Sequence, residues 1–152
     1  MKISVARVDE RLIHGQIINE WVNRTACTHL LIVDDSLVED EFMSNIYKAL
    51  APLWLDVQIR STESAARYLQ ETQSESGRIM LLAKTPLPFE ALVRNGLALE
   101  EVTLADKCYF PNKLPVPEAS QRAVNYLISA GVRVVAQNAP DDDPKSVKQY
   151  KV

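Results

Sequence analysis

His14, near the start of the chain, is surrounded by residue types that suit chemistry on an anion. Asp9 and Arg11 precede it, and Gly15 and Gln16 follow it directly. A histidine in this setting can bind a metal, act as an acid or base, or carry a phosphoryl group on a ring nitrogen. The neighbouring residues therefore decide which of these chemistries the segment supports.

A metal site would need several His, Cys or carboxylate ligands at suitable spacing. The chain has one other histidine, His29, and its two cysteines, Cys27 and Cys108, do not form a C-x-x-C motif. We therefore expect no metal and no other cofactor. Both thiols are expected to be reduced, as in a cytosolic protein.

Phosphate chemistry fits the residues around His14 better. The Arg11 guanidinium can hold phosphate oxygens through paired N–H donors, and the amides of Gly15 and Gln16 can donate to the same anion. Asp9 can accept a proton from the imidazole and fix its tautomer, or it can hold Arg11 in place. The residues alone leave both roles open, and a solvated surface histidine with weak ion pairs is the simpler alternative.

The elements on either side predict where this histidine lies. An apolar run at 3–6 indicates a strand, and the pattern after His14 indicates a helix from Gly15 to Asn23. The histidine then lies on a loop between a strand and a helix, at the edge of an open α/β sheet where ligands bind.

The rest of the chain continues the alternation of strands and helices. We expect further strands at 28–33, 54–59, 78–83, 99–104 and 132–136, with helices between them. Ser36 is a candidate cap for a helix whose predicted buried face contains Leu37, Phe42, Ile46, Tyr47 and Leu50. The predicted fold is α/β, a single-domain open, mainly parallel sheet with helices on both faces.

Prolines predict an irregular or antiparallel edge near residues 99–117, because proline removes a donor from a strand ladder. Asp141 to Pro144 are expected to begin a polar tail. The pair Asp34-Asp35, at the end of a predicted strand, is expected to serve a turn or a helix N-terminus.

Composition limits the class of protein. With 152 residues, 47% of them hydrophobic, residues 1–152 fit one globular domain. A formal charge of -3 with scattered Lys and Arg argues against a nucleic-acid partner. The charged start of the chain lacks a long apolar stretch, so we expect a cytoplasmic protein.

The segment from Arg7 to Gln16, with Trp21 downstream, closely resembles the signature of the IIB subunits of the mannose/fructose/sorbose family of the phosphoenolpyruvate-dependent sugar phosphotransferase system. The resemblance continues through 33–35, 49–52 and 81–86 and so covers most of the chain. It implies that His14 is the phosphorylated histidine, and that Arg11 and Asp9 belong to the active-site loop.

The same resemblance implies a function and partners. A IIA protein would phosphorylate His14, and the phosphoryl group would pass to a sugar bound by the IIC and IID membrane subunits. The chain would then be a protein-N(pi)-phosphohistidine–sugar phosphotransferase, located in the cytoplasm and held at the inner face of the membrane by the permease. A homodimer is left open, and so is the identity of the sugar.

Two alternatives use the same residues differently. A small phosphatase or hydrolase could use His14 covalently, although no separate acid partner is evident, and a regulatory module could keep the fold without catalysis. Leu12 and Ile13 could face a docking partner or the core. The chain departs from the family at 104–111, where many relatives are expected to have a glycine-rich turn; Lys107 in that loop is a candidate second phosphate contact.

Overall fold

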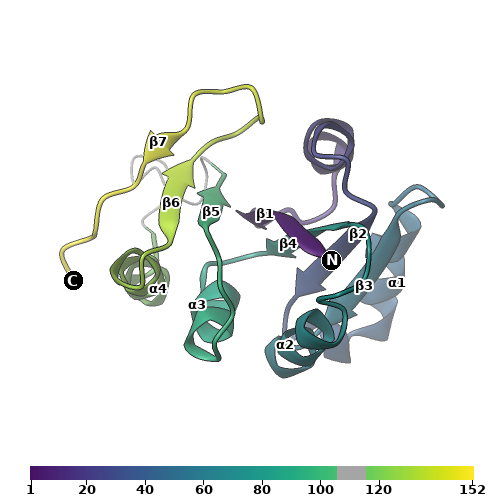
Figure 1. The fold of residues 1–152 in the computed structure, drawn as a ribbon, viewed down its shortest axis with the longest axis horizontal. Coiled ribbons are helices and arrows are strands. Elements are labelled where there is room, and N and C mark those ends of the chain that lie inside the picture. The colour runs from purple at the N-terminus through teal and green to yellow at the C-terminus, as the bar shows by residue number, and fades with distance from the viewer. Residues whose placement is uncertain (106–115) are drawn as a thin grey trace.

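The computed structural model describes residues 1–105 and 116–152. Within them, seven strands form one sheet in the order β3-β2-β4-β1-β5-β6-β7 (Figure 1). Strands β1 to β6 pair in parallel, and β7 pairs antiparallel with β6. The strands are β1 (Lys2–Val8), β2 (His29–Val33), β3 (Asp56–Arg60), β4 (Arg78–Ala83), β5 (Glu101–Leu104), β6 (Arg133–Ala136) and β7 (Lys145–Ser146).

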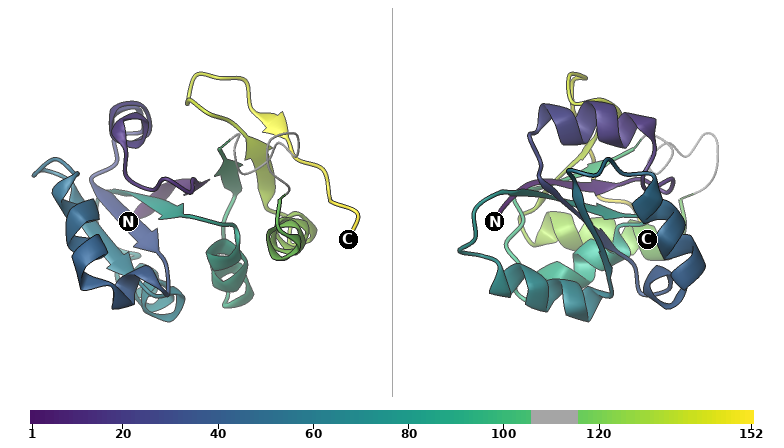
Figure 2. Two further views of the ribbon diagram at one scale, coloured as in Figure 1. Left: turned by 180° about the vertical axis from the view of Figure 1, so that it is seen from behind. Right: turned by 90° about the vertical axis from the view of Figure 1, so that its right-hand side faces the viewer.

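Helices cover both faces of this sheet, which confirms the predicted α/β class. One face packs against α2 (Thr62–Glu71), α3 (Leu87–Arg94) and α4 (Glu118–Ser129). The other face packs against α1 (Glu41–Ala49) and the π-helical segment η1 (Ile17–Val22), and a short 3-10 turn, η2 (Leu37–Glu39), precedes α1. Figures 1 and 2 show η1 on the side of the sheet opposite α2, α3 and α4. None of the helices in the described part of the chain is both long and apolar enough to span a membrane.

The central strands form because their side chains are apolar on both faces. In β4, Ile79 to Ala83 are all buried, as expected for a parallel strand between two helical layers. The helix α2 begins at an N-cap, Ser61, whose side chain accepts a hydrogen bond from the Ser64 amide at 3.2 Å.

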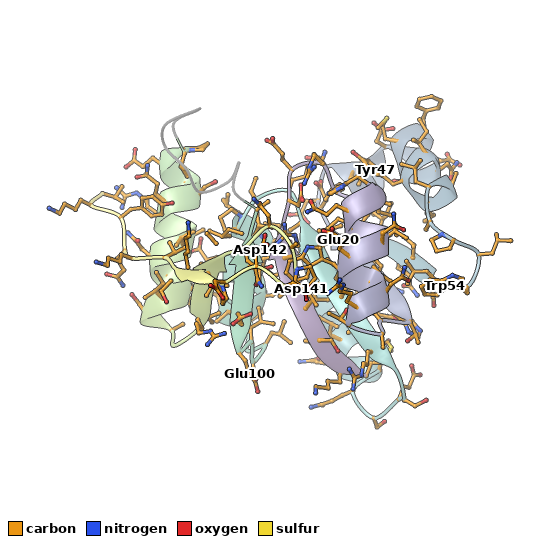
Figure 3. All side chains as sticks on the ribbon, turned by 90° about the horizontal axis from the view of Figure 1, so that it is seen from above. Glu20, Tyr47, Trp54, Glu100, Asp141 and Asp142 are labelled. Carbon is orange, nitrogen blue, oxygen red and sulfur yellow. The ribbon has the colours of Figure 1, made fainter. Side chains whose placement is uncertain are left out.

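The prediction for α1 is wrong in two respects. Its N-cap is Asp40, which accepts from the Met43 amide at 3.0 Å, and Ser36 makes no capping bond to the turn that follows it. The predicted buried face is also largely exposed: Phe42 is 73% exposed, and Ile46 and Leu50 are exposed as well. The helix covers β3, the edge strand, and only a narrow stripe of it faces the core. Trp54, in the turn after α1, is 58% exposed and points away from the sheet (Figure 3).

The predicted antiparallel edge lies elsewhere in the sheet. β5 is an interior strand with parallel partners on both sides, β1 and β6, and its residues Val102, Thr103 and Leu104 are buried. The antiparallel edge strand is β7, which lies in the segment predicted to be a polar tail. The remainder of the predicted edge, 106–115, lies outside the described residues.

The sheet divides between β1 and β5. β1 pairs with β4 along its length, but in the described residues it pairs with β5 at two positions, Arg7 with Thr103 and Val8 with Leu104. On the amino-terminal side of these pairs the strands separate around a hollow of about 920 Å³. The carboxyl ends of β1 and β5 are therefore held together over a short distance.

Candidate functional site

The candidate site lies on the loop that follows β1. The Asp9 amide donates to the Ala83 carbonyl oxygen at 2.9 Å, which joins the start of the loop to the end of β4. The Leu12 amide then donates back to the Asp9 carbonyl oxygen at 3.0 Å and closes a turn. Helical backbone begins at residue 15, directly after His14, so the histidine lies where the sequence predicts it.

Asp9 is the centre of the site. Its side chain is 1% exposed, and its two carboxylate oxygens accept from Arg11 and His14. Oδ1 accepts from the Arg11 amide and from Arg11 Nε, each at 3.1 Å, and Oδ2 accepts from Arg11 Nη2 at 3.0 Å. Oδ2 also lies 3.0 Å from His14 Nε2. Asp9 therefore makes the contacts that both roles considered from the sequence require, one with His14 and one with Arg11.

These contacts determine the ionisation of Asp9. Burial raises the pKa of the carboxyl group, but the hydrogen bonds from Arg11 and His14 and the positive charge of Arg11 together outweigh burial. The net result is a pKa below the ordinary value for aspartate. At neutral pH, Asp9 is a carboxylate and can accept a hydrogen bond from His14 Nε2–H.

His14 is reachable from solvent. Its side chain is 18% exposed, and the position of Gly15 beside it is open, since a Cβ atom there would meet nothing within 4 Å. The helix hydrogen bonds begin with the Ile18 amide donating to the His14 carbonyl oxygen at 3.2 Å. The amides of Gly15 and Gln16 precede that bond, in the first turn, where helix N–H groups can donate to an anion.

Arg11 lies at the surface of the same group of residues. It is 42% exposed, and its Nη2 atom donates both to Asp9 and, at 3.2 Å, to the Gln16 side-chain oxygen. This geometry brings together Asp9, Arg11, His14 and Gln16, with Gly15 next to them.

Arg7 and Trp21 are parts of the site that sequence reasoning did not assign. Arg7 is fully buried, and its Nη2 atom lies 3.9 Å from Asp9 Oδ2. Its guanidinium group stacks on Trp21, with 4.3 Å between Cζ and the ring centroid. One signal was available: Arg7 is a charged residue between the apolar residues Ala6 and Val8 of a predicted strand, where charge is rare unless it is paired.

Leu12 and Ile13 belong to the core and do not form a docking surface. They are 0% and 3% exposed and pack in the cluster that includes Trp21. Leu12 also has a positive φ of 56°, an uncommon conformation for leucine. The strained residue lies in the turn that sets Arg11 and His14 around Asp9.

The other residues singled out in the sequence that the structure describes have partners outside this group. Asp34 Oδ1 accepts from the Ser36 and Leu37 amides, which confirms a turn role, and Asp35 Oδ1 accepts from the Thr62 amide, which confirms a role at a helix N-terminus, that of α2. His29 begins β2, as predicted. Cys27 is buried, whereas Lys107 and Cys108 lie outside the described residues.

Fold and site together define a class: an open α/β protein whose loop histidine is oriented by a buried carboxylate beside an arginine, at the carboxyl edge of the sheet. Residues 3–150 match the family described as "PTS system sorbose subfamily IIB component". The chain belongs to this family. As a IIB component, it accepts a phosphoryl group from a IIA component and passes it to a sugar at the IIC/IID permease.

Proteins of known name are similar to this chain over most of its length. It is 25% identical over 148 residues to the fructose-specific EIIB component of Bacillus subtilis, covering 93% of this chain and 91% of that protein. It is 26% identical over 151 residues to the mannose-specific EIIAB component of Escherichia coli, covering 95% of this chain but 46% of that longer protein. The structure of manxB from Thermoanaerobacter tengcongensis superposes with a TM-score of 0.81 at 27% identity, covering 95% and 92% of the two chains.

Proposed function

We propose that His14 is the residue that carries the phosphoryl group, and that it does so on Nδ1. The observation that carries this proposal is the 3.0 Å contact between His14 Nε2 and Asp9 Oδ2. An ionised carboxylate accepts a hydrogen bond and cannot donate one, so Nε2 carries the proton and Nδ1 keeps its lone pair. The ring is then a nucleophile at Nδ1, the π nitrogen.

Transfer to the protein is a displacement at phosphorus. The Nδ1 lone pair forms the new P–N bond while the P–N bond to the donor histidine of the IIA component breaks, and its electron pair returns to that histidine. The phosphorylated ring of His14, still protonated on Nε2, gains positive charge, which the Asp9 carboxylate at 3.0 Å stabilises. Phosphoryl transfers of this kind depend mainly on positioning and on compensating charge.

Transfer from the protein is a second displacement at phosphorus, in which His14 is the leaving group. A hydroxyl oxygen of the sugar forms the P–O bond, the P–Nδ1 bond breaks, and the hydroxyl proton leaves to a base at the sugar site. Arg11 and the amides of Gly15 and Gln16 are the proposed donors to the phosphoryl oxygens in both steps. The chain then acts, over residues 1–152, as one IIB domain and a protein-N(pi)-phosphohistidine–sugar phosphotransferase, held at the inner face of the membrane by the IIC and IID subunits.

The two histidines of the chain provide the test and its matched control. The protein is incubated with phosphoenolpyruvate, the general phosphotransferase proteins and a IIA component. We expect an acid-labile, base-stable phosphoryl group in wild type and His29→Ala, and none in His14→Ala. Nitrogen-15 NMR of the labelled ring should place phosphorus on Nδ1.

Three results would contradict the proposal. Label that survives in His14→Ala places the phosphoryl group elsewhere, and phosphorus on Nε2 overturns the assigned nitrogen. Steady release of inorganic phosphate without a sugar acceptor would favour the phosphatase alternative.

A further inference from the structure

The buried arginine on β1 joins two parts of the site that are far apart in the sequence. Arg7 Nη1 donates to the Gln137 carbonyl oxygen at 2.7 Å, and Nη2 donates to the Asn138 carbonyl oxygen at 3.1 Å. Both acceptors lie directly after β6, which ends at Ala136. Nη2 of the same guanidinium lies 3.9 Å from Asp9 Oδ2.

Because of its position in the sheet, Arg7 adds side-chain bonds where few backbone bonds join β1 to β5. Arg7 is one of the two residues of β1 that pair with β5, at the point where the two groups of strands separate. Its Nη1 atom also lies 3.4 Å from Oγ1 of Thr103, the β5 residue with which it is in register. The side chain therefore links β1 with β5 and with the segment after β6. It does so where the backbone ladder between strands β3-β2-β4-β1 and strands β5-β6-β7 is short.

The chemistry of a buried guanidinium limits how this link can move. A charged group with no exposure must keep its hydrogen-bond and charge partners, because losing them in a position that solvent does not reach is costly. Trp21 stacks on the guanidinium and donates through Nε1 to the Asn138 carbonyl oxygen at 2.9 Å, so two side chains hold the same backbone oxygen. Arg7 is thus held by the Gln137 and Asn138 carbonyl oxygens and by Trp21, and Oδ2 of Asp9 lies 3.9 Å from this anchored charge.

We infer that Arg7 is a positioning residue for His14: it holds Asp9 Oδ2 where that oxygen accepts from Nε2, and it makes this geometry depend on the segment at 137–138. Arg7 acts through Asp9 and does not touch the phosphoryl group. The inference rests on the proposed role of His14, but it concerns the unphosphorylated protein and can be measured there.

The test reads the tautomer of His14 directly. In nitrogen-15-labelled protein without phosphate, we expect the Nε2–H form to dominate in wild type, a substantial fraction of the Nδ1–H form in Arg7→Met, and an intermediate spectrum in Arg7→Lys. The initial rate of phosphorylation by a IIA component should fall at least tenfold in Arg7→Met and less in Arg7→Lys.

Leu127→Ala is the matched control for a purely structural effect. Leu127 is fully buried in α4, on the face of the sheet opposite η1, so this variant should lose stability while the His14 spectrum stays as in wild type. The inference is overturned if folded Arg7→Met keeps the wild-type tautomer, or if its rate falls only in proportion to the unfolded fraction. If Arg7→Met does not fold, a wild-type spectrum and rate in folded Arg7→Lys overturn it. A wild-type protein that takes no phosphoryl group on His14 refutes the proposed function instead, and leaves the tautomer result intact.

Discussion

Oδ2 of Asp9 lies 3.0 Å from Nε2 of His14. The Asp9 side chain is 1% exposed and the His14 side chain is 18% exposed. The acceptor is thus buried, whereas the imidazole ring of His14 is partly exposed. A carboxylate held in this way selects one ring nitrogen for the proton and leaves the other for chemistry.

Replacing this carboxylate should slow transfer without removing the histidine. In Asp9→Asn the amide can present either oxygen or nitrogen to Nε2, so it no longer selects one tautomer and does not offset charge on the phosphorylated ring. We expect the rate of His14 phosphorylation by a IIA component to fall by about 10²-fold or more. Rapid-quench measurement of labelled protein gives the rate, and an unchanged rate in the folded variant would contradict the role of Asp9.

Arg11 should affect the reaction beyond its effect on the fold. Arg11→Ala leaves the buried Asp9 with His14 and Arg7 beside it and should cost about 1–3 kcal/mol of stability, whereas loss of a donor to the phosphoryl group should slow transfer in the folded protein by about 10²-fold. Arg11→Lys keeps the charge but not the paired N–H donors, so its transfer rate should lie between those of wild type and Arg11→Ala. Arg24→Ala, which removes another exposed arginine paired with Asp141, is the control and should react as wild type. A transfer rate that falls in Arg11→Ala only in proportion to the unfolded fraction would argue for a structural role.

The lowered pKa of Asp9 predicts how stability depends on pH. An unfolded aspartate has a pKa of about 3.9, and the folded value lies below it, so the folded state binds fewer protons in this range. The stabilisation that Asp9 provides is therefore complete above about pH 4 and is lost as the pH falls through the folded pKa. Urea unfolding of wild type and Asp9→Asn should show a difference in unfolding free energy at pH 6 that shrinks towards pH 3. A difference independent of pH would show that the charge of Asp9 does not contribute.

The sequence predicts the order of elements and the histidine loop because both are local properties. Apolar runs such as 78–83 and the cluster from Asp9 to Gln16 are contiguous. It does not predict the partners of Arg7, because Gln137 and Asn138 lie 130 and 131 residues away and contribute backbone oxygens, which any residue type provides. It misplaces Phe42 for a different reason: periodicity shows that a helix has an apolar face, but not whether another layer covers that face.

This difference between Phe42 and a true core residue can be measured. Phe42 is 73% exposed, so Phe42→Ala should change the unfolding free energy by less than about 0.5 kcal/mol. Leu127 is fully buried, and Leu127→Ala should cost about 2–5 kcal/mol. Urea unfolding of both variants gives the comparison. A loss at Phe42 as large as that at Leu127 would mean that another surface covers α1 in solution.

At position 12, glycine should give a more stable protein than alanine, the reverse of the usual order. The residue is fully buried with φ of 56°, a conformation that costs a non-glycine residue about 1–2 kcal/mol. Leu12→Ala and Leu12→Gly both remove a buried side chain, but only glycine is free of the backbone strain. Urea unfolding should therefore show Leu12→Gly to be the more stable variant, whereas at Leu127, inside α4, glycine should be worse than alanine by about 1 kcal/mol. If alanine is the better residue at both positions, the turn that arranges Asp9, Arg11 and His14 is not held in this conformation in solution.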